Sequence, residues 1–453
     1  MGGLSCDSKH RDRARFRVGR VSAYLRHDAW WIYFRENDRP IRRRVAEARE
    51  AAERIAAEVN GQLSAATSTM FAFTPLTVGA LREEFLRFHE QVRRSSVATI
   101  RRYQAATQHL VDYVATLKGE VQAHQLAVAG FVGFLRSREV SPNGHPKSQR
   151  RRLRDKGVQF ILETCRSLYA YAERSRHLPP YFGNPFGNLQ LDRMRIEDSK
   201  AIFVFDADSE LTVLRAAQGT ERWLHFILAK TGLRSGELCR SLIEELDLAG
   251  GWLQVRNKAE LGWRTKTRNE RSIPLIAEVV AVLRRVIGDR TAGPVFLRLK
   301  FDVAKSSLAN RNRQQLAKAV EQRVSQATAA SSQELSRQKQ LLIAQTVWRD
   351  AGALDPDHVR NSFIKVASRA GLTGATCPKS WRHSFATLLQ DANVDPLIRQ
   401  ITLGHQPAGG KAALGMTSIY SHSRPETQAR EIERALRTWP TTLDFVSEQL
   451  QGS

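Results

Sequence analysis

Two proline breaks, Pro179-Pro180 and Asn184-Pro185, divide this chain into parts that cannot belong to one continuous helical array. Before them, from residue 77 to about 175, apolar residues recur with the period of an α-helix. Proline removes a backbone donor and restricts the residue before it, so a helical pattern ends at such pairs. The pattern therefore predicts a helical domain over 76–190, followed by a second domain that starts near Lys200.

The helical domain is expected to contain four helices, because its apolar residues recur with the helical period. Their expected ranges are 78–90, 97–117, 124–138 and 149–174. Ser96 is the expected N-cap of the second helix. Arginines on these helices fit a clamp around a DNA duplex, or equally the solvated faces of amphipathic helices; they are Arg101, Arg102, Arg150, Arg151, Arg152 and Arg154.

The amino-terminal 65 residues carry a different pattern. Aromatic and apolar residues alternate with arginines over 16–45, as in β-strands, and Asn37-Asp38 has the composition of a turn. A helix is expected over 46–63, and a Ser/Thr/Ala linker over 65–75. Residues 1–65 are thus expected to form a small strand-and-helix module that binds DNA. The alternative is a small sheet packed on its own helix, without a DNA partner.

The second domain is expected to span 200–440, leaving 441–453 as a tail. It is mostly helical, with strand-like segments at 252–256 and 271–274. The whole chain is accordingly expected to be mainly α with small β elements, an α+β protein. No apolar run reaches the length of a membrane span, so we expect no membrane partner.

A polar stretch at 303–350 interrupts the second domain, and we expect it to form one long helix or two shorter ones. Leu308, Leu316, Val320 and Val324 recur at helical spacing, so one face could pack. The basic excess favours contact with a DNA backbone or a neighbouring protomer, and the alternative is a solvated excursion without a role. Its basic residues are Lys305, Arg311, Arg313, Lys318, Arg323, Arg337, Lys339 and Arg349.

Charge points to a polyanionic partner. The 453 residues carry a net charge of +24, and lysines and arginines that neutralise phosphates gain affinity by releasing counterions. The alternative is a basic protein that is merely soluble and has no polyanionic partner. The four cysteines show no zinc spacing, and the start of the chain lacks the apolar core of a signal peptide. We therefore expect the protein in a reducing cytoplasm, associated with the nucleoid. The cysteines are Cys6, Cys165, Cys239 and Cys377.

Three short segments carry candidate chemistry. The first, residues 231–238, places Arg234 after a glycine turn with Glu237 three residues on. The second, 379–387, contains Arg382 and His383. The third runs from Leu403-Gly404-His405 to Tyr420. Singly, a buried structural Arg–Glu pair and a core tyrosine are at least as good explanations, but two Arg, a His and a Tyr in this order are specific.

These residue types suit transesterification at a phosphodiester. Negative charge builds on the nonbridging oxygens, and two guanidiniums can hold those oxygens bidentately. A tyrosine can attack phosphorus and keep the bond energy as a phosphotyrosine. A cationic acid must protonate the departing hydroxyl. This chemistry needs neither a metal nor a cofactor.

The three segments resemble the signature boxes of the tyrosine recombinases, the phage integrase family. Arg234 matches the arginine of the family's TGLR-type turn, and Lys379-Ser380-Trp381-Arg382-His383 matches its HxxRH box, with Lys379 where histidine is usual. His405 matches the LGH box, and Tyr420 the nucleophile. Arg271-Ser272-Ile273-Pro274-Leu275 matches the stretch that follows the family's lysine, which is then Lys266. The resemblance covers about residues 77–440.

The resemblance implies a role for each residue. Arg234 and Arg382 would bind the scissile phosphate, with Lys379 and His405 adding hydrogen bonds. Lys266 would be the general acid for the 5′ hydroxyl, with Lys258 and Arg268 as rivals because hairpin register is open. Glu237 would orient Arg234, and His383 would buttress the site. Tyr420 follows His405 after a longer gap than usual.

The activity implied is site-specific recombination through a 3′-phosphotyrosyl intermediate, integrating or excising a mobile element. Double-stranded DNA, a homotetramer on that DNA and accessory DNA-bending or directionality proteins are the implied partners. The helical domain would be the core-binding clamp, and residues 1–65 an arm-type module. Two alternatives stay open: a type IB topoisomerase-like enzyme, and a decayed integrase that only binds DNA.

Overall fold

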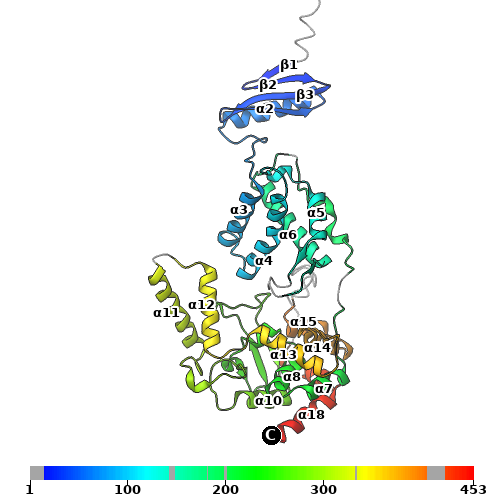
Figure 1. The fold of residues 1–453 in the computed structure, drawn as a ribbon, viewed down its shortest axis with the longest axis vertical. Coiled ribbons are helices and arrows are strands. Elements are labelled where there is room, and N and C mark those ends of the chain that lie inside the picture. The colour runs from blue at the N-terminus through cyan, green and yellow to red at the C-terminus, as the bar shows by residue number, and fades with distance from the viewer. Residues whose placement is uncertain are drawn as a thin grey trace, which may run out of the picture. The chain divides into compact units, whose positions relative to one another are not determined.

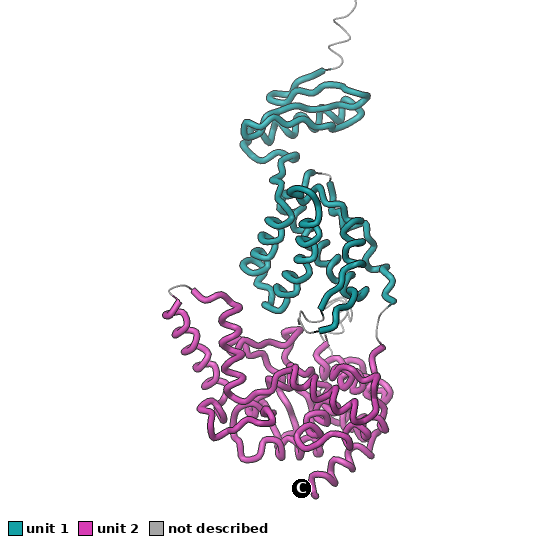
Figure 2. Tube along the Cα trace, in the orientation of Figure 1, with its two compact units in different colours: residues 1–199 teal, residues 200–453 magenta. Residues whose placement is uncertain are grey.

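The computed structural model describes residues 15–141, 148–180, 182–197, 201–331, 334–405 and 424–452. It divides the chain into two compact units, residues 1–199 and 200–453 (Figure 2). Helices dominate both, and the sheets are small (Figure 1). The expected class, mainly α with small β elements, is confirmed. Within the described residues, no helix is long and apolar enough to cross a membrane.

The amino-terminal part of the first unit is a four-stranded antiparallel sheet covered by one helix. Its strands pair in chain order, and the turn between the last two lies at Asn37-Asp38, where both residues have positive φ. Alternate residues of the third strand, Trp30, Ile32 and Phe34, are buried against the helix. The elements are β1 (Arg15–Val18), β2 (Val21–Arg26), β3 (Ala29–Glu36), β4 (Arg39–Ala46) and α2 (Arg49–Ser64).

The linker expected over 65–75 is in part a component of this module. Phe71 is only 4% exposed and packs into the module's core. The backbone N–H and hydroxyl of Thr69 donate to the buried carboxylate of Glu36, at 2.7 and 2.6 Å. The expectation was wrong up to residue 71, because the pattern did not show that one aromatic and one hydrogen-bonded carboxylate are buried together.

Within the described residues, the helical part of the first unit has the expected four α-helices. The Ser96 hydroxyl accepts from the Thr99 N–H at 3.1 Å, which confirms the cap. The expected helix over 149–174 begins later, because Arg151–Arg152 forms a strand (β6) that pairs with Glu139–Val140 (β5). The helices are α3 (Val78–Gln91), α4 (Val97–Ala115), α5 (Val128–Ser137) and α6 (Asp155–Arg174).

The second unit surrounds a three-stranded antiparallel sheet with helices. The strands are β7 (Leu246–Asp247), β8 (Trp252–Val255) and β9 (Arg271–Pro274), in the order β7-β8-β9. The helices are α7 (Ala207–Ala216), α8 (Thr220–Thr231), α9 (Ser235–Leu238), α10 (Ala277–Ile287), α11 (Arg313–Ser331), α12 (Arg337–Asp350), α13 (Pro356–Arg369), α14 (Lys379–Asp391), α15 (Pro396–Leu403), α17 (Pro425–Leu436) and α18 (Pro440–Gln451).

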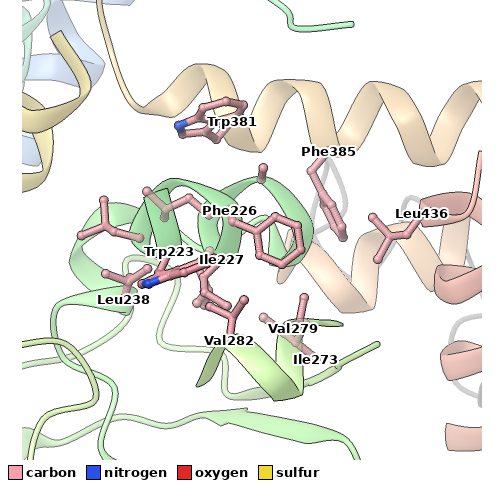
Figure 3. Packing of buried hydrophobic residues seen from close by; sticks show 14 of the residues in the cluster. Trp223, Phe226, Ile227, Leu238, Ile273, Val279, Val282, Trp381, Phe385 and Leu436 are labelled. Atoms are coloured by element: carbon pink, nitrogen blue, oxygen red, sulfur yellow. The ribbon is translucent and has the colours of Figure 1, made fainter. Parts of the chain in front are cut away.

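Helices α8 and α14 pack at the centre of the second unit's core. Trp381 is fully buried and stacks on Phe205 with ring centroids 4.0 Å apart. Figure 3 shows Trp381 and Phe385 projecting from α14 toward the helix that carries Phe226. Burial of such aromatic side chains contributes on the order of 2 kcal/mol each. This packing fixes α14, which bears Lys379 and Arg382, against the core that includes α8, the helix that leads to Arg234.

Residues 441–453, expected to be a tail, are mostly the helix α18. Leu443 and Val446 are buried in the main core, which explains why the helix packs rather than frays.

The stretch at 303–350 forms α11 and α12, with Leu316 and Val320 buried on one face, as the apolar spacing predicts.

Candidate active site

Arg234 is positioned by the turn that ends α8. Gly232 caps this helix with a φ of +61°, in the left-handed region. A Cβ at this position would lie 2.5 Å from the ring of Phe385 on α14. Backbone conformation and packing therefore both require glycine here. The chain then starts α9, and Arg234 is its N-cap residue.

Glu237 holds two arginines at once. Its carboxylate accepts from the backbone N–H and the guanidinium of Arg234, at 2.9 and 2.8 Å. It also accepts from both terminal nitrogens of Arg271 on β9, at 3.1 and 2.7 Å. Burial alone would raise the pKa of this carboxyl group, but the hydrogen bonds and charges of Arg271 and Arg234 lower it to about 2. Glu237 is therefore an anion at neutral pH.

Arg382, in the second signature segment, connects it to the first and the third. It lies on α14 and is only 7% exposed. Its guanidinium donates to the carbonyl oxygen of Gly232 at 2.7 Å and to that of Leu403. Burial, and then the charge of Arg234, lower its pKa to about 10, so it remains a cation at neutral pH. Among the described residues, its planar group is held by the two fixed carbonyls rather than by a carboxylate.

His405 follows the helix α15 and its cap, Gly404. A Cβ at Gly404, whose φ is +63°, would lie 2.9 Å from Cδ of Arg271. The Nε of Arg271 also donates to the carbonyl oxygen of Thr402 at 2.9 Å. Burial, and then the charges of Arg382 and Arg234, lower the pKa of His405. The imidazole is consequently neutral at pH 7 and can donate one hydrogen bond.

Lys266 lies in a turn beside the His405 segment. We call residues 265–268 the Lys266 turn; the Arg268 N–H donates to the carbonyl oxygen of Thr265 at 3.1 Å and closes it. The hydroxyl of Thr267 lies 3.5 Å from the carbonyl oxygen of Gly404. The side chain of Lys266 is exposed. The turn therefore lies against the segment that carries His405, with Lys266 exposed on it.

The rival lysine has a structural partner. Lys258 is 1% exposed, and its ammonium lies 2.7 Å from the carboxylate of Glu245. The same ammonium also lies 5.0 Å from the ring centre of Trp263. A buried ion pair of this kind is not available to a large external substrate. Arg268, the other rival, is exposed and has a φ of +60°.

Lys379 and His383 lie one helical turn apart at the start of α14. Lys379 is exposed, whereas His383 is half-buried. Burial, and then the charges of Lys379 and Arg382, lower the pKa of His383, so this imidazole is neutral at pH 7. Its Nε2 is buried without a hydrogen-bond partner among the described residues. His383 thus lies partly inside the unit while Lys379 remains accessible, and the supporting role of His383 stays a prediction.

The predicted nucleophile, Tyr420, lies outside the described residues, as does the whole segment 406–423. The chain enters this segment after His405 and leaves it before α17. The site is therefore described for Arg234, Lys266, Lys379, Arg382 and His405. The assignment of Tyr420 stays a prediction from its match to the signature boxes.

Arg271 is the residue that sequence analysis missed. It belongs to the stretch that located Lys266, but no role was assigned to the arginine itself. Its contacts with Glu237, Thr402 and Gly404 make it, beside Arg382, a second link between the first and third segments. The sequence did hold a signal for such a residue. A buried carboxylate beside Arg234, here Glu237, requires compensation by further hydrogen bonds or charge.

The arrangement concentrates positive charge. Among the residues that the structure describes, the carboxylate of Glu237 is the one that balances Arg234, Arg271 and Arg382. Such a cluster suits an anion with several oxygens, such as a phosphodiester. Within the described part of the chain, no group of three or more His, Cys, Asp or Glu residues is arranged to hold a metal ion.

Comparisons with known proteins agree on one family. Residues 204–427 match the model of the phage integrase family. The chain is 26% identical to the tyrosine recombinase XerA of Pyrococcus furiosus over 215 residues, 48% of this chain and 54% of XerA. It is 24% identical to the tyrosine recombinase XerD of Listeria monocytogenes over 346 residues, 76% of this chain and 93% of XerD. The chain thus spans about half the length of the first relative and most of the second.

The fold has a counterpart among solved structures. The integrase of transposon Tn1549, in complex with transposon right end DNA, superposes with a TM-score of 0.50 and 16% identity. The match covers 79% of this chain and 99% of that one. At this level of identity, the likeness concerns the fold alone.

Proposed function

The chain belongs to the phage integrase family, and from that premise we propose that it is a site-specific DNA recombinase that cuts and rejoins strands through a 3′-phosphotyrosyl intermediate. The observation that carries the proposal is the shared carboxylate of Glu237, which holds Arg234 and Arg271 together, with Arg382 anchored on the adjoining turn. Preorganised guanidiniums of this kind stabilise the charge that develops on a phosphoryl group in the transition state.

The proposed reaction exchanges one phosphoester bond for another. The phenolic oxygen of Tyr420 attacks phosphorus and loses its proton to water. As the new bond forms, the bond from phosphorus to the 5′ oxygen breaks. Lys266 gives a proton to that departing oxygen. The free 5′ hydroxyl of a partner strand then reverses these steps and restores a continuous strand, so no external energy source is needed.

The remaining residues stabilise the phosphate. Arg234 and Arg382 bind its nonbridging oxygens, and the neutral His405 donates one hydrogen bond to them. Lys379 replaces the usual histidine and supplies a further charged donor. The accessible side chain of Lys379 at the start of α14 is consistent with that role.

DNA binding involves both units in this proposal. Residues 76–190 form the core-binding clamp, and 200–440 the catalytic domain, with a homotetramer assembling on DNA during strand exchange. The amino-terminal module presents exposed arginines along the edge strand β4: Arg39, Arg42, Arg43 and Arg44. These favour contact with a second, arm-type DNA site. Accessory bending or directionality proteins, a nucleoid location and a mobile element as the natural substrate complete the proposal.

A strand-exchange assay tests the function. The DNA flanking the gene is sequenced, direct repeats at the ends of an inserted element are identified, and two marked DNAs carrying them are incubated with the protein. The proposal expects recombinant products that depend on both repeats. Relaxation of a plasmid that lacks the repeats, without exchange, would instead indicate a topoisomerase; binding without cleavage would indicate a decayed integrase.

A further inference from the structure

Helices α11 and α12 form an antiparallel pair that we call the insertion hairpin (Figure 1). The pair packs against the chain excursion between β8 and β9, residues 256–270, and shares a small hydrophobic core with it, separate from the main core. This core comprises Leu242, Leu261, Leu316, Val320, Ala344, Val347, Trp348, Ala351 and Ala353. The insertion is therefore part of the folded unit and contacts the segment that carries Lys266.

The tip of the excursion is docked on α12. The indole N–H of Trp348 donates to the carbonyl oxygen of Leu261 at 3.0 Å, in buried surroundings. Gly262 follows with a φ of +67°, and a Cβ there would lie 2.9 Å from Cβ of Ala344. The backbone at Gly262 therefore packs directly against Ala344. A shift of the tip along α12 would break this packing.

Arg313, the first residue of α11, contacts the base of the excursion. Its Nη2 donates to the carbonyl oxygen of Asn257 at 2.8 Å, and its Nε donates to the carboxylate of Glu260 at 2.5 Å. Its backbone N–H donates to the carboxylate of Glu244 at 2.8 Å. One arginine thus fixes the start of α11 and the backbone at Asn257 together.

Asn257 in turn organises the Lys266 turn. Its side-chain oxygen accepts from the backbone N–H of Thr265 at 2.9 Å. Its side-chain nitrogen donates to the carbonyl oxygen of Arg268 at 2.8 Å. The residues at both ends of the turn are therefore hydrogen-bonded to the side-chain amide of Asn257. The backbone carbonyl of Asn257 is in turn held by Arg313. Lys266 lies between these two ties.

The basic residues of the insertion are largely engaged within the chain. Arg313 pairs with Glu260, and Arg323 with Asp350, at 2.5 and 2.7 Å. Lys305 and Arg349 lie 3.1 and 3.6 Å from carboxylates of Asp302 and Asp350. Arg313 and Arg323 are partly buried in their pairs, so both have a role within the unit, whereas Lys305 and Arg349 remain mostly exposed.

We infer that the insertion hairpin positions Lys266, through Arg313 and Asn257, for protonation of the departing 5′ oxygen. The inference rests on the proposed function, in which Lys266 is the general acid. Arg313 is a positioning residue here, because it acts on the Lys266 turn only through Asn257. A displacement of about 1 Å at a proton donor can cost on the order of a hundredfold in rate, so a support of this kind has a measurable effect.

The test changes the leaving group. Single-turnover cleavage is measured on a nicked DNA substrate whose scissile 5′ oxygen is either kept or replaced by sulfur. A 5′ thiolate is a much weaker base than an alkoxide and departs without a proton, so the sulfur substrate makes the general acid dispensable. Lys266→Ala is expected to slow cleavage about a hundredfold or more with oxygen and to approach wild-type rate with sulfur.

Arg313→Ala is expected to slow the oxygen substrate roughly tenfold to a hundredfold and to recover with sulfur. Glu260→Gln, a milder change that removes only the ion pair with Arg313, is expected to show a smaller loss with the same recovery. The matched control is Arg323→Ala, which removes a comparable half-exposed ion pair on the same helix without touching the excursion. It is expected to behave as wild type with both substrates.

The outcomes separate the two levels of the proposal. If Lys266→Ala is not rescued by sulfur, the general acid is misassigned and the inference fails with it. If Lys266→Ala is rescued but Arg313→Ala and Glu260→Gln slow both substrates equally, or slow neither, the positioning role is wrong while the proposed function stands. A sulfur rescue of Arg313→Ala also shows that the variant is folded, since only a folded site cleaves the sulfur substrate.

Discussion

The carboxylate of Glu237 accepts a hydrogen bond from each terminal nitrogen of Arg271, at 3.1 and 2.7 Å. These residues are 34 positions apart, and Glu237 uses the same two oxygens to hold Arg234. The pair is almost fully buried. Removing one partner of such a pair leaves an uncompensated charge in the interior, so the contact governs both the stability and the geometry of the site.

Glu237→Gln is expected to destabilise the second unit by about 3–5 kcal/mol at pH 7. The folded protein lowers the pKa of Glu237 from 4.5 to about 2, so its stabilising contribution is complete above pH 4.5 and is lost as pH falls toward 2. The stability gap between wild type and variant should therefore narrow over this range. Chemical denaturation at stepped pH measures it, with Glu433→Gln in the exposed pair with Arg437 as control. A gap that is constant with pH would contradict the account.

Arg234→Lys is expected to reduce single-turnover cleavage by about a hundredfold or more, with a smaller effect on DNA affinity. Lysine keeps the charge but lacks the planar fork that meets both Glu237 and a phosphate. Arg284→Lys, at an exposed position on α10, serves as the control and should cleave normally. A loss of less than tenfold for Arg234→Lys would argue against direct phosphate contact.

Cleavage is expected to proceed at an unchanged rate in excess EDTA. The physical reason is that three arginines around the site supply the positive charge that a divalent metal provides in other phosphoryl-transfer enzymes. Rates are compared in EDTA and in magnesium at the same ionic strength, because salt changes DNA binding by itself. A cutting step that requires added magnesium would refute this mechanism.

Deletion of residues 1–72 is expected to leave core-site cleavage measurable and to abolish recombination that depends on outlying sites. The cut falls after Phe71, because this residue and Thr69 belong to the module's own core. Footprinting of the full chain and the truncated chain on the same DNA measures the lost contacts. An unchanged footprint and unchanged recombination would show that the module has no arm-type role.

Local features of the fold were predictable from the sequence, because caps and periodicity act over a few residues. Such patterns predicted the Ser96 cap, the Asn37-Asp38 turn, and the two strands that flank the excursion, β8 and β9. Features that depend on distant partners were not. Phe71 is buried by residues outside its own segment, and α18 is held by the main core, so a linker and a tail were expected in their places.

In the candidate site, too, residues in local motifs were predictable and residues that depend on distant partners were not. Arg234, Arg382 and His405 were found from short motifs, and the structure brings their segments together. The choice between Lys258 and Lys266 required the register of the excursion, which one sequence does not contain; burial of Lys258 against Glu245 now favours Lys266. Arg271 escaped notice because its partner lies 34 positions away. The part played by Tyr420 remains a prediction.

The most direct test of the account is the identity of the residue that becomes linked to DNA. The protein is trapped on a nicked substrate bearing its recognition site, digested, and the peptide that retains the nucleotide is sequenced by mass spectrometry. The account predicts a 3′ phosphate bonded to Tyr420, and a Tyr420→Phe variant that binds the same DNA but forms no adduct. An adduct on another residue, or one that survives in Tyr420→Phe, would contradict it.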